Sequence, residues 1–464
     1  MKKRSSFAVN PFVLIFAAIL FVSVLSFVIE PGQIVNGEYS ALPRNTLCFD
    51  TVFSVFRSIP MGIKDSASII VLILSVGGVL GVYKKTGAVS AGIDRVVCRT
   101  KNKTSNYFIL ALLIVFFSFL GGFLGWIEVL IPFAPLVTTV ILALGFDAVT
   151  AVAAIIVGCM AGFMAGPTNL YTVAVCNGIL QNMGLLPEDA NVFTGFLFRL
   201  ILWILITAVS VGYILLYARR VRRDSTKSLV YKADAPDGIP PDADPVPFSR
   251  QHFLILLTFL IAVALIFLGM QHGIDGRKWT IDDISAVFIA SGILSGIIAR
   301  LKCSDIVDAF LSGVKSAVPG ALIVGLARSV YWITDNANIN ATIIYWAARL
   351  LDGLSPLAAA FGIVIFVSLI NGLIPSGSGK AMLLGPIIFP VAERLGIPAQ
   401  TSVLAYQFGD GITNMFWFSF GTLMIFLSYG NVPIQKWWKF FCPLMAIFFG
   451  VAFAALVAAI SLGI

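Results

Sequence analysis

The stretch that decides the fold runs from Asn371 to Asn414 and reads NGLIPSGSGKAMLLGPIIFPVAERLGIPAQTSVLAYQFGDGITN. It lies in an otherwise apolar sequence, but at two places, 375–380 (PSGSGK) and 409–414 (GDGITN), it becomes small, polar and non-helical in character. Hydrocarbon offers no hydrogen-bond partner to a freed backbone N–H or C=O. Irregular backbone at membrane depth is therefore buried in protein or lines a water-filled cavity. We interpret the two breaks as half of a solute site.

The composition places the chain in a membrane. Of its 464 residues, 59% are hydrophobic and only 12% are charged, whereas soluble proteins have about 25% charged residues. Apolar runs of 18 or more residues recur, which predicts an all-α polytopic membrane protein surrounded by lipid. The net charge of +8 comes from short basic clusters between apolar runs. Such clusters are topology signals, so they predict a cytoplasmic N-terminus and no nucleic-acid partner.

Two repeats are expected, joined by a polar linker. Residues 224–250 are rich in Asp and Pro and have too little apolar content to bury a core, which is typical of a flexible cytoplasmic linker. The repeats on either side are 1–223 and 251–464. Each should contain a re-entrant hairpin and then a broken transmembrane helix, at about 106–145 and 147–180 in the first and about 356–395 and 398–429 in the second. Amphipathic stretches at 51–63, 305–316 and 339–351 should lie on the membrane surface.

Short motifs recur in the same order in both halves. Gly-Pro-Thr-Asn at 166–169 returns as Gly-Ile-Thr-Asn at 411–414, and Leu-Gly at 144–145 returns as Leu-Gly at 395–396. The distribution of basic residues makes the first hairpin enter from the cytoplasm and the second from outside. The sequence therefore predicts an inverted repeat, with a solute site near the midplane between its halves.

Four segments also carry a family resemblance: GWIEVLIPFAPLVTTVILALGFD (125–147), AGPTNLYTVAVCNGI (165–179), IPSGSGKAMLLGPIIFPVAERLGI (374–397) and LAYQFGDGITNMF (404–416). Together they resemble the YfcC family, which is related to the C4-dicarboxylate anaerobic carrier (DcuC) family of the ion-transporter superfamily. The resemblance implies a homodimeric carrier of the bacterial inner membrane with elevator-type movement. Substrates of such carriers include dicarboxylates, basic amino acids and short-chain fatty acids.

Three positions depart from that family's pattern. Relatives often carry paired acids at the first hairpin tip, where this chain has only Glu128 between Ile127 and Val129. Lys380 follows SGSG in place of a commonly neutral residue, and Phe-Trp-Phe at 416–418 stands where proline is frequent. The departures at Glu128 and Lys380 change the charge expected near the site.

The second hairpin tip is predicted to bind a carboxylate. A half-helix that begins after the tip directs unsatisfied N–H groups and about half a positive charge toward the cavity. In the segment Ser376, Gly377, Ser378 and Gly379, the glycines allow a ligand to approach the backbone closely and the serine hydroxyls add hydrogen-bond donors. Lys380 adds a positive charge. The alternative is a tight turn held by local bonds from serine to the backbone.

Asp410 is the strongest single candidate, because an intramembrane carboxylate is costly and marks a functional site by default. It is expected to bind a cation, a substrate ammonium or a coupling proton, and Glu128 is its counterpart at the first tip. The alternative for both acids is a salt bridge to Lys380 or Arg328. Arg328 is either a second carboxylate anchor or structural, and Arg199 is expected to snorkel or to pair.

The Thr168–Asn169 and Thr413–Asn414 pairs place oxygens and amides beside unwound carbonyls. They are expected to hold the substrate, with Na⁺ as a candidate ligand at Asn169, Asp410 and Asn414. Their alternative role is to satisfy the broken backbone. The coupling ion is Na⁺ or H⁺, and no other cofactor is expected.

These patterns predict a secondary active transporter that works by alternating access on a small carboxylate-bearing metabolite. Acids beside Lys380 suit a zwitterion, which favours an amino acid over the alternative, a C4-dicarboxylate. An ion channel is the alternative from another class. An enzyme is not expected, because GSGK lacks the strand-and-helix context of a phosphate-binding loop and no paired nucleophile and base is visible.

Overall fold

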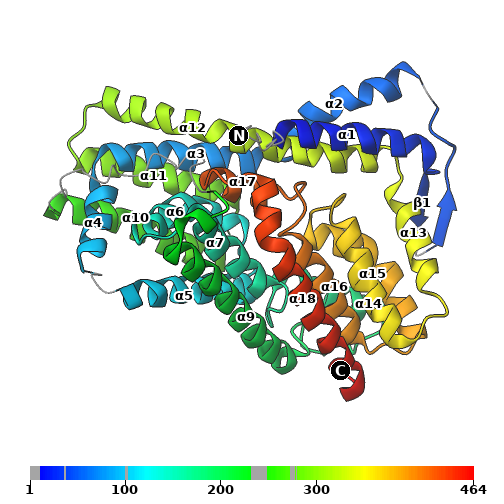
Figure 1. The fold of residues 1–464 in the computed structure, drawn as a ribbon. Helices are drawn as coiled ribbons and strands as arrows, with labels where there is room; N and C mark the ends of the chain where they lie inside the picture. Colours follow the sequence, from blue (N-terminus) through cyan, green and yellow to red (C-terminus); the bar gives the residue numbers. More distant parts are fainter. Residues whose placement is uncertain are drawn as a thin grey trace, which may run out of the picture.

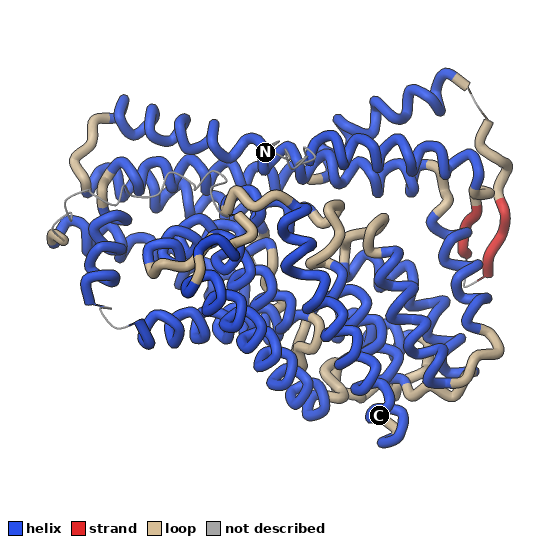
Figure 2. Tube along the Cα trace, viewed as in Figure 1, coloured by secondary structure: helices blue, strands red, loops and turns tan. Residues whose placement is uncertain are grey.

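The structure is a computed structural model that describes residues 11–35, 38–46, 48–99, 103–230, 248–271, 277 and 279–464. It is mainly helical (Figure 2). A short antiparallel hairpin of β1 (Gly32–Val35) and β2 (Glu38–Ala41) follows the first helix. Most of the predicted linker, 231–247, lies outside the described residues.

Seven of the described helices are long and apolar enough to cross a membrane, which confirms the predicted class. The first half contains α1 (Pro11–Val28), α2 (Phe49–Asp65), α3 (Ala67–Lys85), α4 (Ala88–Arg99), α5 (Lys103–Phe119), η1 (Leu120–Leu124), η2 (Glu128–Phe133), α6 (Ala134–Ala143), α7 (Ala148–Phe163), η3 (Leu170–Ala174), α8 (Val175–Asn182), α9 (Phe196–Arg223) and η4 (Ser225–Lys227). The second half contains α10 (Arg250–Gln271), α11 (Ile281–Ile298), α12 (Cys303–Asn336), α13 (Asn340–Leu351), α14 (Pro356–Ile370), α15 (Gly377–Arg394), α16 (Ala399–Thr413), α17 (Gly421–Tyr429) and α18 (Ile434–Leu462).

Two long helices, α3 and α12, pack along each other and form the centre of one layer (Figure 1). Glycines bring their backbones together, because a Cβ at Gly81 would lie 2.2 Å from the carbonyl oxygen of Ala309 and one at Gly313 would lie 2.1 Å from that of Gly77. Small residues at such an interface allow close van der Waals packing in lipid. α1 packs on α12, and α11 packs on α3.

The second layer repeats one packing order. In the first half α5 packs on α7 and α7 on α9, and in the second half α14 packs on α16 and α16 on α18. Helices fill the ranges expected for the hairpin arms and the interrupted helices, whereas their re-entrant or membrane-spanning course stays a prediction. This order agrees with the expected repeat, whereas its inverted orientation across the membrane stays a prediction.

Two expected boundaries were wrong. The predicted surface stretch at 305–316 and the following span form one helix, α12, which continues through Pro319. The predicted break at 409–414 begins later, because α16 is helical to Thr413 and the chain leaves helical geometry between α16 and α17. The glycines in that motif provide close contact: a Cβ at Gly409 would lie 2.7 Å from the carbonyl oxygen of Val364, and one at Gly411 2.3 Å from Met164 Cβ.

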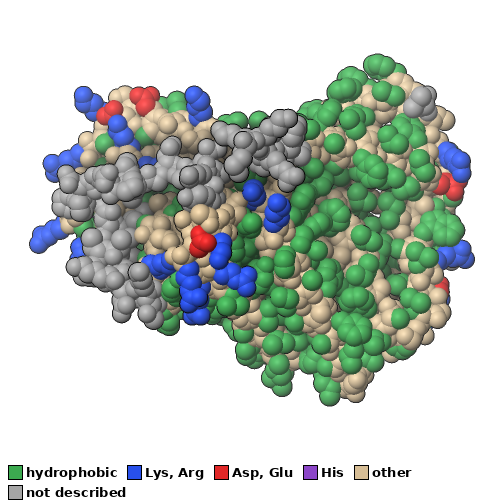
Figure 3. Space-filling model, viewed as in Figure 1, with side chains coloured by type: hydrophobic (Ala, Val, Ile, Leu, Met, Phe, Trp, Pro, Cys, Tyr) green, Lys and Arg blue, Asp and Glu red, His purple; other side chains and the backbone are tan. Residues whose placement is uncertain are grey.

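The outer surface suits lipid. In the view of Figure 3 the right-hand part of the molecule is covered mainly by apolar side chains, whereas Lys and Arg gather in the left-hand part and at the right edge. On α9, for example, Leu197, Ile201, Ile204 and Leu205 are exposed. Apolar side chains in this number are expected where a helix faces hydrocarbon rather than water.

Close packing of α5 and η1 on α7 gives a testable expectation. A Cβ at Gly162 would lie 1.9 Å from the carbonyl oxygen of Ser118, so Gly162→Ala should destabilise the protein by about 1–3 kcal/mol through overpacking. Gly212→Ala is the control, because no atom lies within 4 Å of its added methyl group. It should be neutral or stabilising by up to about 1 kcal/mol. Equal thermal stability of the two variants in detergent would contradict this packing.

Candidate functional site

The hairpins and interrupted helices of both halves meet in one region. α15 of the second hairpin contacts η3 and α8, and α16 contacts α7 and η3. A Cβ at Gly377 would lie 3.6 Å from both Phe163 Cζ and Thr172 Cγ2, which belong to the first half. The structure therefore brings the second hairpin tip beside the first interrupted helix, although the two are about two hundred positions apart in sequence.

At the centre of this region lies a buried ion pair. Lys380 Nζ donates to Asp410 Oδ1 at 2.7 Å, and both side chains are 0% exposed. The ammonium also donates to Asn371 Oδ1. The salt bridge that was weighed as the alternative role of Asp410 is thus formed. Such a pair is not by itself evidence for stability, because desolvating two charges costs as much as their attraction returns.

Asn371 organises the end of α16 around this pair. Its amide nitrogen donates to the carbonyl oxygen of Asp410 at 3.1 Å, to Thr413 Oγ1 at 3.1 Å and to Asn414 Oδ1 at 2.8 Å. Asn414 Nδ2 in turn donates to Asp410 Oδ2 at 3.4 Å. Sequence reasoning did not identify Asn371 as part of the site. The available signal was an asparagine at the end of an apolar hairpin arm.

The predicted carboxylate-binding tip is the first turn of α15 rather than an irregular segment. Ser376 caps the helix by accepting the N–H of Gly379, as the alternative reading had it. Within the described residues, the N–H groups of Gly377 and Ser378 have no hydrogen-bond acceptor. Asp410 Oδ2 would lie 3.2 Å from a Cβ at Gly377. The free N–H groups are therefore next to the ion pair.

In the first half, Thr168 and Asn169 satisfy the interrupted backbone. Asn169 Oδ1 accepts the N–H groups of Tyr171 and Thr172, and its Nδ2 donates to the carbonyl oxygen of Phe163. Thr168 Oγ1 donates to the carbonyl oxygen of Phe123 at 2.9 Å. Both side chains thus take the structural role that was kept as the alternative.

The candidate Na⁺ ligands already accept hydrogen bonds. Asn169 Oδ1 is used by backbone N–H groups, Asp410 Oδ1 by Lys380, and Asn414 Oδ1 by Asn371. The described part of the chain also contains no group of three or more His, Cys, Asp or Glu residues that could hold a metal ion. Na⁺ binding at these oxygens therefore stays a prediction.

Glu128 begins η2 at the first hairpin tip and is partly exposed. Among the described ion pairs, none joins Glu128 to Lys380 or Arg328. The salt bridge that was the alternative for Glu128 is therefore not formed in the described structure.

Arg199 neither snorkels nor pairs with an acid in the described structure. Its guanidinium is buried and donates to Gln407 Oε1, to Gln400 Oε1 and to the carbonyl oxygen of Thr194. Gln407 Nε2 donates at 3.0 Å to the carbonyl oxygens of Phe163 and Gly166, which the interruption of α7 sets free. Arg199 thereby orients the side-chain amide of Gln407, which satisfies the carbonyl oxygens freed where α7 is interrupted.

Sequence reasoning also missed Gln407. It lies three positions before Asp410 on α16, which was the available signal. Arg328 is placed elsewhere: its guanidinium lies 4.5 Å from the ring centre of Tyr331 on its own helix, α12. No described contact joins Arg328 to Asp410 or Lys380.

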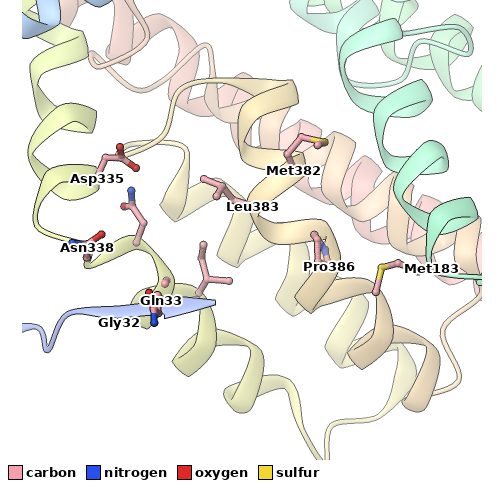
Figure 4. A pocket seen from close by; sticks show the side chains of 11 residues that line it. Gly32, Gln33, Met183, Asp335, Asn338, Met382, Leu383 and Pro386 are labelled. Atoms are coloured by element: carbon pink, nitrogen blue, oxygen red, sulfur yellow. The ribbon is translucent and has the colours of Figure 1, made fainter. Parts of the chain in front are cut away.

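A cavity of about 560 Å³ lies beside the ion-pair region, between α15 and the end of α12 with α13 (Figure 4). In Figure 4, Met382, Leu383 and Pro386 of α15 lie across from Asp335 and Asn338. None of the predicted site residues lines this cavity. The Lys380–Asp410 pair is thus not part of the cavity lining, and both of its side chains are fully buried.

Apolar helices around a buried charge pair and interrupted backbone are the features of a multi-pass membrane transporter. The chain belongs to the C4-dicarboxylate anaerobic carrier (DcuC) family, whose model matches residues 6–461. This confirms the resemblance found from the sequence motifs. It also agrees with the expectation that the protein is not an enzyme, because the matched family and relatives are transporters.

Two relatives cover most of the chain. YfcC of Escherichia coli (strain K12), whose name describes it provisionally as a basic amino acid antiporter, is 25% identical over 422 residues, which are 88% of this chain and 81% of YfcC. An uncharacterised protein of Haemophilus influenzae is 27% identical over 88% of this chain and 78% of its own length. A provisionally named short-chain fatty acid transporter of Escherichia coli (strain K12) is 23% identical over 55% of this chain and 57% of its own length.

Among solved structures, the YdaH transporter of Alcanivorax borkumensis matches with a TM-score of 0.45 and 17% identity, covering 98% of each chain. The antimetabolite efflux pump MtrF of Neisseria gonorrhoeae matches with a TM-score of 0.41 and 18% identity, covering 97% of this chain and 95% of MtrF.

The buried pair can be tested by a double-mutant cycle with Lys380→Met, Asp410→Asn and both together. Each single change leaves a buried partner without its counter-charge, so each should destabilise the protein by about 3–5 kcal/mol. The double variant should lose less stability than the two single variants together, since no unpaired charge remains in it. Stability would be measured by thermal unfolding in detergent. Effects that add within about 0.5 kcal/mol would show that the two side chains are not coupled.

Proposed function

We propose that the protein is a secondary active transporter for a small carboxylate-bearing metabolite, with an amino acid as the favoured substrate. The observation that carries this proposal is the fully buried Lys380–Asp410 pair next to the free N–H groups at the start of α15. When the substrate replaces each partner of this ion pair, Lys380 binds the carboxylate of a zwitterion and Asp410 binds its ammonium.

In the proposed complex the substrate carboxylate accepts the N–H groups of Gly377 and Ser378 and approaches the ammonium of Lys380. Asp410 and Glu128 then face the substrate ammonium. Supporting this, Asp410 Oδ2 would lie 3.2 Å from a Cβ at Gly377, beside the free N–H groups. Thr413 and Asn414 hold the Asp410 end of the site through Asn371. Charge-assisted hydrogen bonds of this kind are the strong ones in a water-poor site.

A C4-dicarboxylate is the second candidate, favoured by the description of the matched family. A second carboxylate needs a second cation, and Arg328 was its expected anchor. Arg328 instead lies over Tyr331 on α12, which leaves the dicarboxylate with less support than the amino acid. The name of YfcC also favours an amino acid. A channel is the remaining alternative, and it would conduct ions far faster than a carrier turns over.

The proposed transport cycle is alternating access of the elevator type, in which the hairpins and interrupted helices move together against the layer built on α3 and α12. It is driven by an ion gradient or by exchange. We place the homodimeric protein in the bacterial inner membrane with its N-terminus in the cytoplasm, which follows from the basic clusters and the family resemblance.

Uptake into liposomes tests the substrate class. Purified protein should accumulate a radiolabelled amino acid, with a basic amino acid tested first, when an ion gradient or a preloaded counter-substrate is present. Succinate is the matched comparison for the dicarboxylate alternative, and empty liposomes are the control. Accumulation of succinate without any amino acid would reject the favoured substrate.

The role of Asp410 is tested in the same assay. Asp410→Asn should abolish gradient-driven uptake, because the neutral amide no longer attracts a substrate ammonium or a coupling ion. Asp352→Asn is the matched control and should retain uptake, since Asp352 pairs with Arg394 at the exposed surface. Such surface pairs contribute at most about 1 kcal/mol. Undiminished uptake by Asp410→Asn would remove Asp410 from the mechanism.

A further inference from the structure

We propose that the ammonium of Lys380 occupies the place of a bound monovalent cation, as a permanently tethered positive charge. The carrier therefore needs no Na⁺ to load its site, and removal of the Lys380 side chain creates a cation site. The inference deepens the proposed transport function by assigning the source of the positive charge beside Asp410.

The ammonium contacts two oxygens of the kinds that bind metal cations. It contacts a carboxylate oxygen of Asp410 and the amide oxygen of Asn371, and it is completely buried. Hard monovalent and divalent cations take oxygen ligands of these types. A lysine ammonium is itself a compact point charge, so it fits such a position better than a planar guanidinium would.

The helix ends around Lys380 add to the attraction for a cation. Asn371 is the residue that ends α14, and Asp410 lies in the last turn of α16. The C-terminal end of a helix carries about half a negative charge, and in transporters with interrupted helices such ends coordinate the coupling cation. Side chains at the C-terminal ends of two helices thus meet at Lys380 Nζ, and one of them is a carboxylate.

The positive charge comes from a different helix than the two residues that it contacts. Lys380 belongs to the first turn of α15, whereas Asn371 and Asp410 belong to α14 and α16. One side chain from the hairpin tip therefore joins the ends of two other helices. A dissolved cation would do the same work but would leave at each cycle, whereas the lysine moves with the protein.

Thermal unfolding of the ligand-free full-length protein in detergent tests the inference. NaCl or KCl would be exchanged for choline chloride at constant ionic strength. The wild-type Tm should not depend on the cation. Lys380→Ala opens the space and leaves Asp410 unpaired, so its Tm should rise with Na⁺ or K⁺ and saturate, on the order of 2–4 °C or more. Lys380→Ala/Asp410→Asn is the matched control and should show no rise.

A saturable increase of the wild-type Tm with Na⁺ would overturn the inference, and so would a Lys380→Ala protein that no inorganic cation stabilises. If Lys380→Ala does not yield folded protein, Lys380→Ser provides the same test with a small polar side chain. Uptake by the wild type should also be equal in Na⁺ and choline solutions, and a Na⁺ requirement would overturn the inference. Absence of uptake in both solutions would contradict the proposed function alone, because the unfolding experiment needs no substrate.

Discussion

The requirement that interrupted helices satisfy their freed backbone groups inside the protein governs the centre of this molecule. Water is absent from hydrocarbon, so each free carbonyl or N–H needs a side chain or another helix. Gln407 serves the carbonyl oxygens of Phe163 and Gly166, and Asn371 serves the end of α16. In both cases the side chain comes from a different helix than the groups it satisfies. The hydrogen bonds that satisfy the freed backbone groups therefore also hold the hairpins and interrupted helices together.

Charge is distributed unevenly in this closed region. Arg199, Lys380 and Asp410 are the buried charged side chains among the described residues, which gives two cations and one anion. Lys380 neutralises Asp410, whereas Arg199 is held by amide and carbonyl oxygens. A buried charge without a counter-ion is costly, so the region electrostatically favours an additional anionic group. In the function proposed above, a substrate carboxylate is that group.

Local sequence patterns predicted the positions of the main elements well and misjudged the polar motifs. The membrane-spanning class followed from apolar runs, because the hydrophobicity of each helix depends on that segment alone, whereas the limits of the linker stay a prediction. The glycines of the GDGITN motif were interpreted as a break, although Gly409 and Gly411 allow α16 to touch Val364 and Met164. SGSGK was interpreted as irregular, although Ser376 caps a helix that includes the rest of it. A glycine has the same local signature in a turn and in a close helix crossing.

The sequence by itself determined the membrane class and the family, and it singled out Asp410 as a candidate, because a carboxylate in an apolar run is informative without any partner. Only the tertiary structure decided which side chains meet. It paired Asp410 with Lys380, assigned Asn169 and Thr168 to the backbone, placed Arg328 away from the ion pair, and brought Arg199 to Gln407. Hydrogen bonds and ion pairs act over a few ångströms between residues tens to hundreds of positions apart. Their partners are therefore fixed by helix packing, which no single stretch of sequence encodes.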